Sequence, residues 1–331
     1  MIKHIRYIFS KDFNPYNNLA LEEYLLNHVK EEECILYLWQ NEKTVVIGKN
    51  QNAWKECKIR ELEEDGGKLV RRLSGGGAVF HDLGNLNFTF ILHKDNYDLD
   101  KQLEVIIKAV KNVNINAEKT GRNDITVEGR KFSGNAFYTD GNRSYHHGTI
   151  LISVDMNNLS KYLNVSRDKL MSKGVESVKS RVINLKEYNP NLDIDRMKKE
   201  LLLAFREIYD CELAPIDEKE IVELEMKALV EKFSSWDWIY GRKMEWTYSM
   251  NKRFTWGNID LNFVVESGRI TRCAIYSDAM DTWFAENIPA YMQNCLFTSE
   301  HILERLNKIS VDVKRKDCMQ DIKDMVYSER L

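Results

Sequence analysis

The sequence lacks the patterns that mark secreted, disulfide-linked and membrane-spanning proteins. Its six cysteines form no C-x-x-C pair, which argues against a zinc site and against a disulfide framework. Residues 1–18 contain no apolar segment of a secretory signal, and no apolar run approaches the ~20 residues that a membrane helix needs. We therefore expect a cytoplasmic protein that does not bind membranes.

A strong excess of charge of one sign is also missing. The chain has 48 lysines and arginines against 51 aspartates and glutamates, and its formal net charge at pH 7 is −3. Surfaces that bind nucleic acids normally carry an excess of positive charge. The charge balance therefore gives no support for a nucleic-acid partner.

Several common catalytic and nucleotide-binding motifs are absent as well. The sequence has no G-x-x-x-x-G-K-[ST], no G-x-G-x-x-G, no G-x-S-x-G and no H-E-x-x-H. Their absence argues against a P-loop, a dinucleotide-binding turn, the nucleophile turn of serine hydrolases and a zinc-protease helix. If the chain binds a phosphorylated ligand, it uses a different loop.

The length and composition allow more than one core. The chain has 331 residues, of which 43% are apolar, and this favours one large domain and a smaller one. Three tryptophans and a glycine lie in the stretch SSWDWIYGRKMEW (234–246), which has no clear period, and strand patterns resume after it. We place the boundary there and expect domains at 1–242 and 243–331.

Hydrophobic periodicity predicts an α+β fold with a largely antiparallel sheet. Residues 34–39 and 44–48 are expected to pair as a hairpin, and Asn17 or Asn18 is expected to cap the first helix. Further strands are expected over 2–9, 68–73, 86–92, 124–154 (three strands) and 253–278 (three strands). Helices are expected up to residue 30, then over 58–65, 98–113, 155–163, 167–172, 194–209, 217–232 and beyond 283.

The segment RRLSGGGAVFHDLGNLNFTFILH (71–93) carries the strongest functional signal. Three consecutive glycines leave the backbone bare, so that its N–H groups can approach an anionic ligand. Arg71 and Arg72 are fork-shaped donors suited to phosphate or carboxylate. A plain turn needs neither these arginines nor the dense polar residues that follow, which indicates a lined pocket.

A second unusual segment is TGRNDITVEGRKFSGNAFY (120–138). Asp124 precedes a strand and Lys131 follows a tight turn onto the next strand, so the two are expected to lie near each other across a hairpin. A third strand begins at HHGT (146–149) and brings His146 or His147 alongside.

Together the two segments indicate a site for an anionic, phosphorylated ligand, with backbone donors, guanidinium groups and one ammonium group. Adenylation of a carboxylic acid by ATP fits this set of groups, because the protein must mainly position the reactants and neutralise charge. The residues alone do not identify the acid.

These segments resemble the lipoate–protein ligases of the adenylating kind. RRLSGGGAVFHDLGNLNFTF is similar to the family signature, and GRNDITVEGRKFSG is similar to its GRND…K-x-SG segment. The resemblance also includes NPYNNLALEEYLL (14–26) and TVVIGKNQNAWKEC (44–57), and it covers nearly the whole chain. Departures are few: Lys49 and Ala53 stand where arginine and proline are common.

The resemblance implies a large domain with the mixed sheet of biotin ligases and class II aminoacyl-tRNA synthetases, and a small α+β C-terminal accessory domain. It implies that lipoate and ATP, with Mg²⁺, form lipoyl-AMP and pyrophosphate. The lipoyl group then passes to a lysine of an acceptor. The implied acceptors are apo lipoyl domains of 2-oxo acid dehydrogenase complexes and the glycine cleavage H protein.

The same resemblance implies the roles of individual residues. Lys131 is the expected catalytic residue, and Asp124 is the expected ligand of Mg²⁺. An apolar slot for the dithiolane is expected from the strands that carry Val45, Val46 and Phe88. The residues expected to bind ATP or the adenylate are Arg72, Gly75, Gly76, Gly77, Ala78, Val79, Phe80, Asn123, Asp124 and Lys131. Those expected to bind lipoate are Arg72, Ser74, His81, Lys131 and His147.

Three alternatives remain open. An octanoyl or lipoyl transferase of the same fold would use a cysteine nucleophile and no ATP, but no cysteine lies between 58 and 210. A biotin ligase would run the same chemistry on another acid. A lipoate-binding protein without catalysis would have a decayed site, whereas Lys131, Arg72 and the glycine run are intact.

Overall fold

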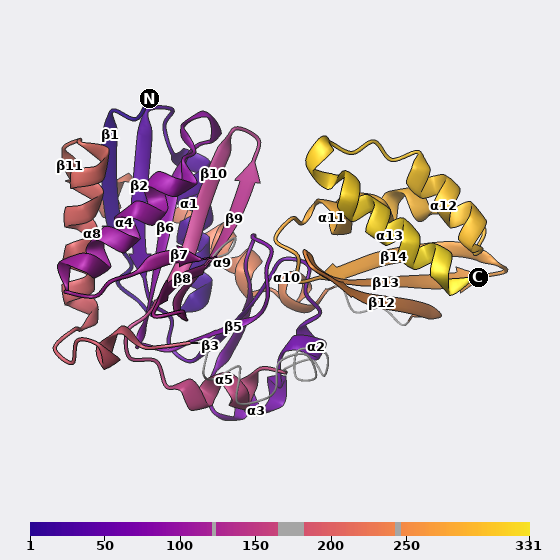
Figure 1. Cartoon of the computed structure of the whole chain (residues 1–331), viewed down its shortest axis with the longest axis horizontal. Helices are drawn as coiled ribbons and strands as arrows, with labels where there is room; N and C mark the ends of the chain where they lie inside the picture. Colours follow the sequence, from indigo (N-terminus) through magenta and orange to yellow (C-terminus); the bar gives the residue numbers. More distant parts are fainter. Residues whose placement is uncertain (121–123, 165–181, 242–245) are drawn as a thin grey trace.

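The computed structural model describes residues 1–120, 124–164, 182–241 and 246–331. Within these residues, an eight-stranded mixed sheet forms the centre of the larger part, in the order β11-β1-β2-β6-β10-β9-β8-β7 (Figure 1). β1 pairs in parallel with β2 and β11, and the other pairs are antiparallel. The strands are β1 (His4–Phe9), β2 (Glu33–Trp39), β6 (Asn85–His93), β7 (Glu118–Thr120), β8 (Asp124–Val127), β9 (Arg130–Asp140), β10 (Arg143–Leu151) and β11 (Leu213–Pro215).

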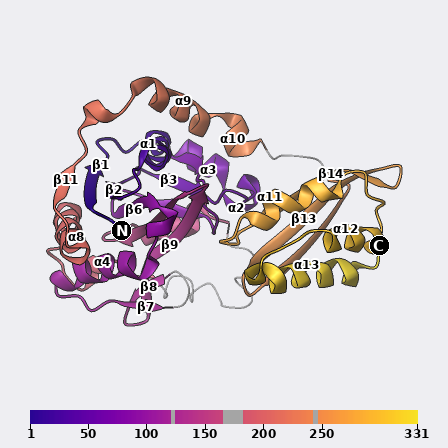
Figure 2. The ribbon, with the colours of Figure 1, turned by 90° about the horizontal axis from the view of Figure 1, so that it is seen from above.

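Helices cover both faces of this sheet (Figure 2). One face packs on α4 (Leu99–Asn112) and α8 (Ile194–Tyr209), and the other packs on α1 (Pro15–His28) and α9 (Glu223–Ser234). β2 shows how the sequence serves both faces: Leu36 and Leu38 belong to the first core, whereas Tyr37 and Trp39 belong to the second. Successive side chains of a strand point to opposite faces, so a strand buried on both sides is apolar throughout.

The start of α1 differs from the prediction. Asn14 caps the helix by accepting from the Tyr16 N–H, and Pro15 occupies the first turn, where its missing N–H costs nothing. Asn18 is buried inside the helix, and its side chain donates to the Gln40 carbonyl oxygen and to Asn41. The expectation of a cap at Asn17 or Asn18 is therefore wrong.

A small sheet of three strands lies beside the main one among the described residues. β3 (Thr44–Ile47) pairs in parallel with β4 (Lys68–Arg71) and antiparallel with β5 (Val79–His81). The expected hairpin between residues 34–39 and 44–48 is wrong, because β2 pairs with β1 and β6 instead. Val45 and Ile47 face a separate core, which gives β3 a sheet of its own. Around this sheet lie α2 (Ala53–Glu56), α3 (Ile59–Glu64), α5 (Met156–Tyr162) and α10 (Trp236–Tyr240).

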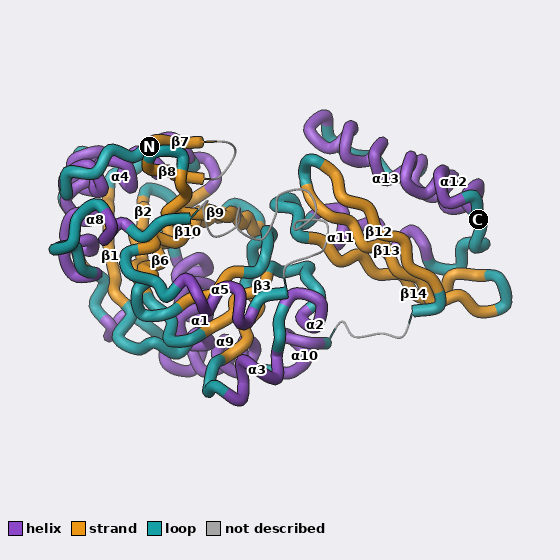
Figure 3. The backbone as a smooth tube through the Cα atoms, turned by 60° about the horizontal axis from the view of Figure 1, so that its bottom comes forward, coloured by secondary structure: helices purple, strands orange, loops and turns teal. Residues whose placement is uncertain are grey.

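The C-terminal part has its own core, and its strands and helices are seen apart from the main sheet in Figure 3. A three-stranded antiparallel sheet within the described residues packs against helices that follow it in the chain. The predicted meander is confirmed, and its first turn lies at residues 255–256. The expected boundary at residues 242 and 243 falls outside the described ranges. The elements are β12 (Tyr248–Phe254), β13 (Gly257–Glu266), β14 (Arg269–Ser277), α11 (Trp283–Met292), α12 (Ser299–Asn307) and α13 (Lys316–Glu329).

The α+β class is thus confirmed, as is the three-stranded run over 124–154. The helix expected over 167–172 lies outside the described residues. Across the ranges that the structure describes, no helix is both long and apolar enough to span a bilayer.

Candidate functional site

A cavity of about 330 Å³ lies between the glycine-rich segment and the main sheet. Its walls include residues 76–80 of the glycine-rich segment, Trp39 of β2 and Leu19 of α1. Arg72 and Lys131 contribute two cationic side chains, and among the described residues no carboxylate lines the cavity. The site can therefore accept an anion next to an apolar wall.

Arg71 does not reach this cavity. Its guanidinium is buried and donates to the backbone carbonyl oxygens of Trp238 and Ile239 in α10, at 2.6–3.2 Å. It also donates to those of Gly48 (3.1 Å) and Gln51 (2.7 Å) after β3. The interpretation of Arg71 as an anion-binding residue is therefore wrong, since its donors tie α10 to the loop after β3.

Arg72 holds the glycine loop in place through hydrogen bonds to its backbone. Its Nη2 donates to the carbonyl oxygens of Gly75 (2.7 Å) and Gly77 (2.8 Å), and its Nε donates to Ser74 Oγ (3.0 Å). Burial lowers the pKa of the guanidinium to about 10, so the group stays charged at neutral pH. The loop thus takes its form around a buried cation.

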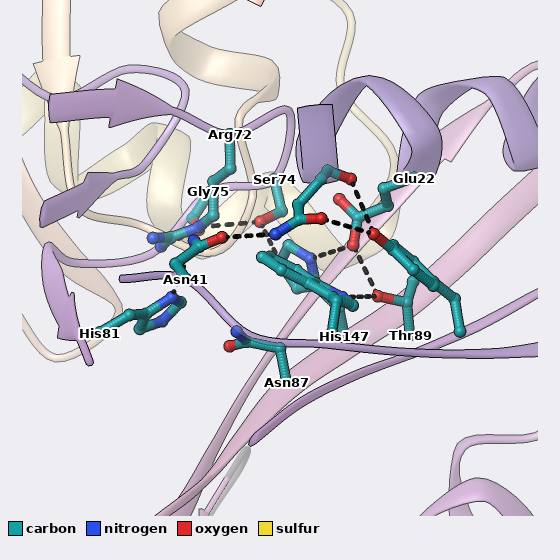
Figure 4. Close-up of polar contacts among 12 residues, drawn as sticks. Glu22, Asn41, Arg72, Ser74, Gly75, His81, Asn87, Thr89 and His147 are labelled. Carbon is teal, nitrogen blue, oxygen red and sulfur yellow. Dashed lines mark hydrogen bonds and ion pairs between the residues drawn. The ribbon is translucent and has the colours of Figure 1, made fainter. Parts of the chain in front are cut away.

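A chain of hydrogen bonds continues from Arg72 to a buried carboxylate (Figure 4). Ser74 Oγ lies 2.7 Å from His147 Nε2, and His147 Nδ1 lies 2.8 Å from Glu22 Oε1. If the Ser74 hydroxyl donates to Nε2 and Nδ1–H donates to Glu22, every donor has one acceptor. Thr89 Oγ1 also donates to Glu22 Oε1 (2.7 Å). We call Arg72, Ser74, His147 and Glu22 the Arg72–Glu22 chain.

Sequence reasoning missed Glu22. It is 1% exposed and lies on the helix face that also carries Leu19, Leu25 and Leu26. A lone acid on the apolar face of a helix signals a buried partner, because an ionised carboxylate is rarely buried without one. That signal was available, but the partner lies 125 positions away on β10.

Lys131 and Asp124 lie where the hairpin prediction placed them. Lys131 Nζ is 2.6 Å from Asp124 Oδ1, and both side chains are more than a third exposed. Gly134 makes room for this lysine, since a Cβ there would lie 2.8 Å from Nζ. Asn123 lies outside the described residues. Among the residues that are described, no group of three metal-ligating side chains gathers, so Asp124 is a single hard-oxygen donor.

His81 is one of the residues that line the cavity. Asn18 Nδ2 donates to Asn41 Oδ1 (2.9 Å), which leaves Asn41 Nδ2 to donate to His81 Nδ1 (3.3 Å). The proton of the neutral ring is therefore on Nε2. Burial is the main reason that the pKa of His81 falls to about 3, and the nearby Arg72 charge acts in the same direction.

The glycine loop touches the C-terminal part. Gly76 has φ +92°, and its N–H donates to the Ala279 carbonyl oxygen at 3.1 Å. A Cβ on Gly75 would lie 2.5 Å from the same oxygen, so only glycine fits there. Met280 lines the cavity beside the loop. The small part thus covers one edge of the site.

The remaining expected residues divide into two groups. The cavity is lined by Val46, Gly77, Ala78, Val79 and Phe80. Ser74 and Gly75 do not line it but form hydrogen bonds with the lining residues His147 and Arg72. Val45 and Phe88 belong to other cores, because their side chains point away from the cavity wall. Trp39, which sequence reasoning did not select, provides the aromatic wall instead.

Comparison with known proteins identifies the family to which the chain is similar. Residues 14–206 match the lipoyl protein ligase A/B catalytic domain, and residues 243–324 match the bacterial lipoate protein ligase C-terminus. The chain is 38% identical to the lipoate-protein ligase A of Psychrobacter cryohalolentis over 92% of this chain and 93% of that protein. It is 40% identical to that of Blochmanniella floridana, over 84% of both chains.

Solved structures agree. P. falciparum LipL1 in complex with lipoate has a TM-score of 0.85 at 32% identity and covers 98% of this chain and 99% of its own. A lipoate-protein ligase A bound with ATP has a TM-score of 0.63 at 25% identity, over 73% of this chain and 99% of that one. A bi-partite lipoate protein ligase from Thermoplasma acidophilum, studied with its E2 lipoyl domain, has a TM-score of 0.65 at 26% identity, over 75% and 100%. The chain belongs to the lipoate–protein ligase family and is a ligase, as its motifs predicted.

Proposed function

We propose that this chain activates lipoate with ATP and then transfers the lipoyl group to a lysine of an acceptor lipoyl domain. One observation carries the proposal: the cavity joins two cations and a bare glycine loop to an apolar wall, with no carboxylate among its described lining residues. A carboxylic acid with an apolar tail and a nucleotide phosphate fit the two halves of such a cavity. The relatives bound to lipoate and to ATP support both ligands.

The acyl chain would lie across the main sheet. Trp39 pairs with Asn87, Asn87 pairs with Thr149, and the Thr149 hydroxyl accepts from the Gly134 N–H (3.3 Å). Directly paired residues point to the same face, and adjacent strands lie about 4.8 Å apart, so this row spans about 14 Å. Lys131 folds over Gly134 at one end of the row, and Trp39 stands at the other.

In the first step, a lipoate carboxylate oxygen attacks the α-phosphorus of ATP, and the bond to pyrophosphate breaks. We assign Lys131 to hold the carboxylate and the α-phosphate, because its ammonium group offsets the charge that develops there. In the second step, the acceptor lysine amine attacks the acyl carbonyl, loses a proton, and AMP leaves. Lys131 then polarises that carbonyl.

Backbone N–H groups of residues 76–80 and the cation of Arg72 would face the nucleotide, and Asp124, paired with Lys131, would lie near its phosphates. Mg²⁺ fits a site of this kind only in part. Asp124 supplies one carboxylate, and ATP phosphates would complete the ligands, as is usual for this ion. When bound, the ion would neutralise phosphate charge.

We further propose that the chain works as domains 1–242 and 243–331 in the cytoplasm. The acceptors would be apo lipoyl domains of 2-oxo acid dehydrogenase complexes and the glycine cleavage H protein. The relative studied with its E2 lipoyl domain supports the first class. The cysteines in the described part of the chain are all free thiols, which suits a reducing compartment.

The test is lipoate-dependent exchange of labelled pyrophosphate into ATP without any acceptor. The proposal predicts exchange with lipoate and Mg²⁺ and none with biotin. Modification of an acceptor without ATP would instead support a cysteine-based transferase. Cys57 argues against that chemistry, since burial raises the pKa of its thiol to about 12.

A further inference from the structure

Two buried N–H donors in side chains beside the apolar wall take no part in the two reaction steps described above. His81 and Asn87 both line the cavity, and their buried atoms His81 Nε2 and Asn87 Nδ2 have no hydrogen-bond partner among the described residues. His81 is 3% exposed and Asn87 is 1% exposed. A buried donor without an acceptor costs about 1–3 kcal/mol, so a pair of them indicates a ligand that accepts.

The surrounding network fixes what His81 offers. Asn18 Nδ2 is committed to the Gln40 carbonyl oxygen (2.8 Å) and to Asn41 Oδ1, so the Asn41 amide has one orientation. Asn41 Nδ2 then donates to His81 Nδ1 (Figure 4). The proton of the neutral ring is therefore on Nε2. The side chain that faces the cavity is a neutral donor. Asn87 Oδ1 accepts from Asn85 Nδ2 (2.9 Å), which leaves Asn87 Nδ2 as the second neutral donor.

Both donors lie at the Trp39 end of the row. Asn87 is the direct strand partner of Trp39, and the His81 and Trp39 rings have centroids 6.2 Å apart in an edge contact. Lys131 folds over Gly134, two strands beyond Asn87. An acid whose carboxylate is held by Lys131 would therefore bring its tail to His81 and Asn87. Arg72 lies nearby, but its Nη2 is directed at the glycine-loop carbonyl oxygens.

We propose that His81 and Asn87 are specificity-determining residues that select a sulfur-containing ring over an all-carbon tail. Dithiolane sulfur is a weak acceptor that tolerates an apolar wall, so it can receive these N–H groups without a charge. A straight or carbocyclic alkyl tail leaves both donors unpaired. This inference rests on the proposed function, because it assumes that the carboxylate lies at Lys131.

The test compares two acids that differ only in sulfur. One is lipoate, and the other is 5-cyclopentylpentanoate, in which a cyclopentane ring replaces the dithiolane. In the wild type, kcat/KM for pyrophosphate exchange should be about tenfold higher or more for lipoate, as expected for a buried donor that loses its acceptor. This arm needs no variant and does not depend on folding.

The variants Asn87→Leu and His81→Leu remove one donor each. Each should move the ratio of the two acids towards one by lowering kcat/KM for lipoate alone, while the remaining donor keeps part of the preference. Thr149→Val, which changes the next side chain of the same row, is the matched control and should keep the wild-type ratio. Equal rates for the two acids in the wild type, or an equal loss for both acids in the variants, would overturn the inference. If neither acid supports exchange, the proposed function itself fails.

Discussion

The backbone N–H of Gly76 donates a hydrogen bond to the carbonyl oxygen of Ala279 at 3.1 Å. This N–H belongs to the loop that we assign to the nucleotide, so the C-terminal part occupies a donor that ATP phosphate would use. Further contacts hold the two parts together. The Ser277 N–H donates to the backbone carbonyl oxygen of Asn50 (3.0 Å), and Lys49 forms an ion pair with Glu286 (2.8 Å). ATP binding and release of residues 277–280 should therefore be coupled.

Glu286→Gln tests this coupling at a distance from the cavity. Losing a partly exposed ion pair costs up to about 1 kcal/mol, so the KM for ATP should fall by up to about fivefold while kcat stays the same. Lys119→Gln, which breaks the Lys119–Asp100 pair elsewhere on the surface, is the control. An unchanged KM in Glu286→Gln, with small-angle scattering that is identical before and after lipoyl-AMP forms, would contradict the coupling.

Gly48 tests the packing under the glycine loop. A Cβ at this position would lie 2.2 Å from the Gly76 carbonyl oxygen, and backbone cannot yield as a side chain can. Gly48→Ala should therefore lower the free energy of unfolding by about 1–3 kcal/mol. A Cβ at Gly77 meets nothing within 4 Å, so Gly77→Ala should unfold at the wild-type urea midpoint. Equal midpoints for the two variants would show that the loop is not packed on Gly48.

Glu22→Gln tests the Arg72–Glu22 chain. Removing the buried charge should cost about 2 kcal/mol of stability and raise the KM for ATP more than that for lipoate, because Arg72 shapes the glycine loop. Glu23→Gln is the matched control on the same helix, since Glu23 pairs with Lys232 on the surface side. Equal increases in the KM values for ATP and lipoate would show that the Arg72–Glu22 chain has only a structural role. Glu22→Asp keeps the charge, so it should show a smaller loss of stability and a smaller increase in the KM for ATP than Glu22→Gln.

His81 gives the protein a pH dependence with a defined sign. Burial lowers its pKa from the ordinary value of 6.5 to about 3 in the folded state, so below pH 6.5 the unfolded chain binds a proton that the folded chain does not. Stability should therefore fall as the pH decreases from about 6.5 towards 3, by up to 1.4 kcal/mol per pH unit from this residue. Urea unfolding of His81→Gln should show a shallower slope than the wild type, while His4→Gln, at an exposed site, should not. Parallel slopes for His81→Gln and the wild type would be inconsistent with a neutral buried ring.

The sequence allowed the local parts of this site to be predicted. Lys131 and Asp124 meet across a short hairpin, so strand periodicity and one turn were enough to pair them. The helices over 98–113 and 194–209 followed from their apolar faces. What failed depends on long-range packing. Glu22 contacts His147 only because α1 packs on the sheet. β3 does not form the expected hairpin, because Val45 and Ile47 pack in a second core.

Arg71 shows a different limit. Two adjacent arginines before a glycine run look alike in sequence, but successive residues of an extended strand point to opposite sides. Arg72 therefore faces the loop and the cavity, whereas Arg71 faces α10. Residue type indicated the chemistry of both side chains, and only their direction distinguished the arginine that lines the cavity from the arginine that packs against α10.

The most direct test of the central claim is intact-mass analysis of an apo lipoyl domain incubated with the protein, ATP, Mg²⁺ and lipoate, run in parallel with Lys131→Met. We predict one lipoyl adduct with the wild type and a rate lower by about 10²–10³ with the variant, the usual cost of losing one charge-stabilising donor. Circular dichroism should show the wild-type fold in Lys131→Met, because the lysine is more than a third exposed. An adduct that forms without ATP, or at the wild-type rate with Lys131→Met, would contradict the account.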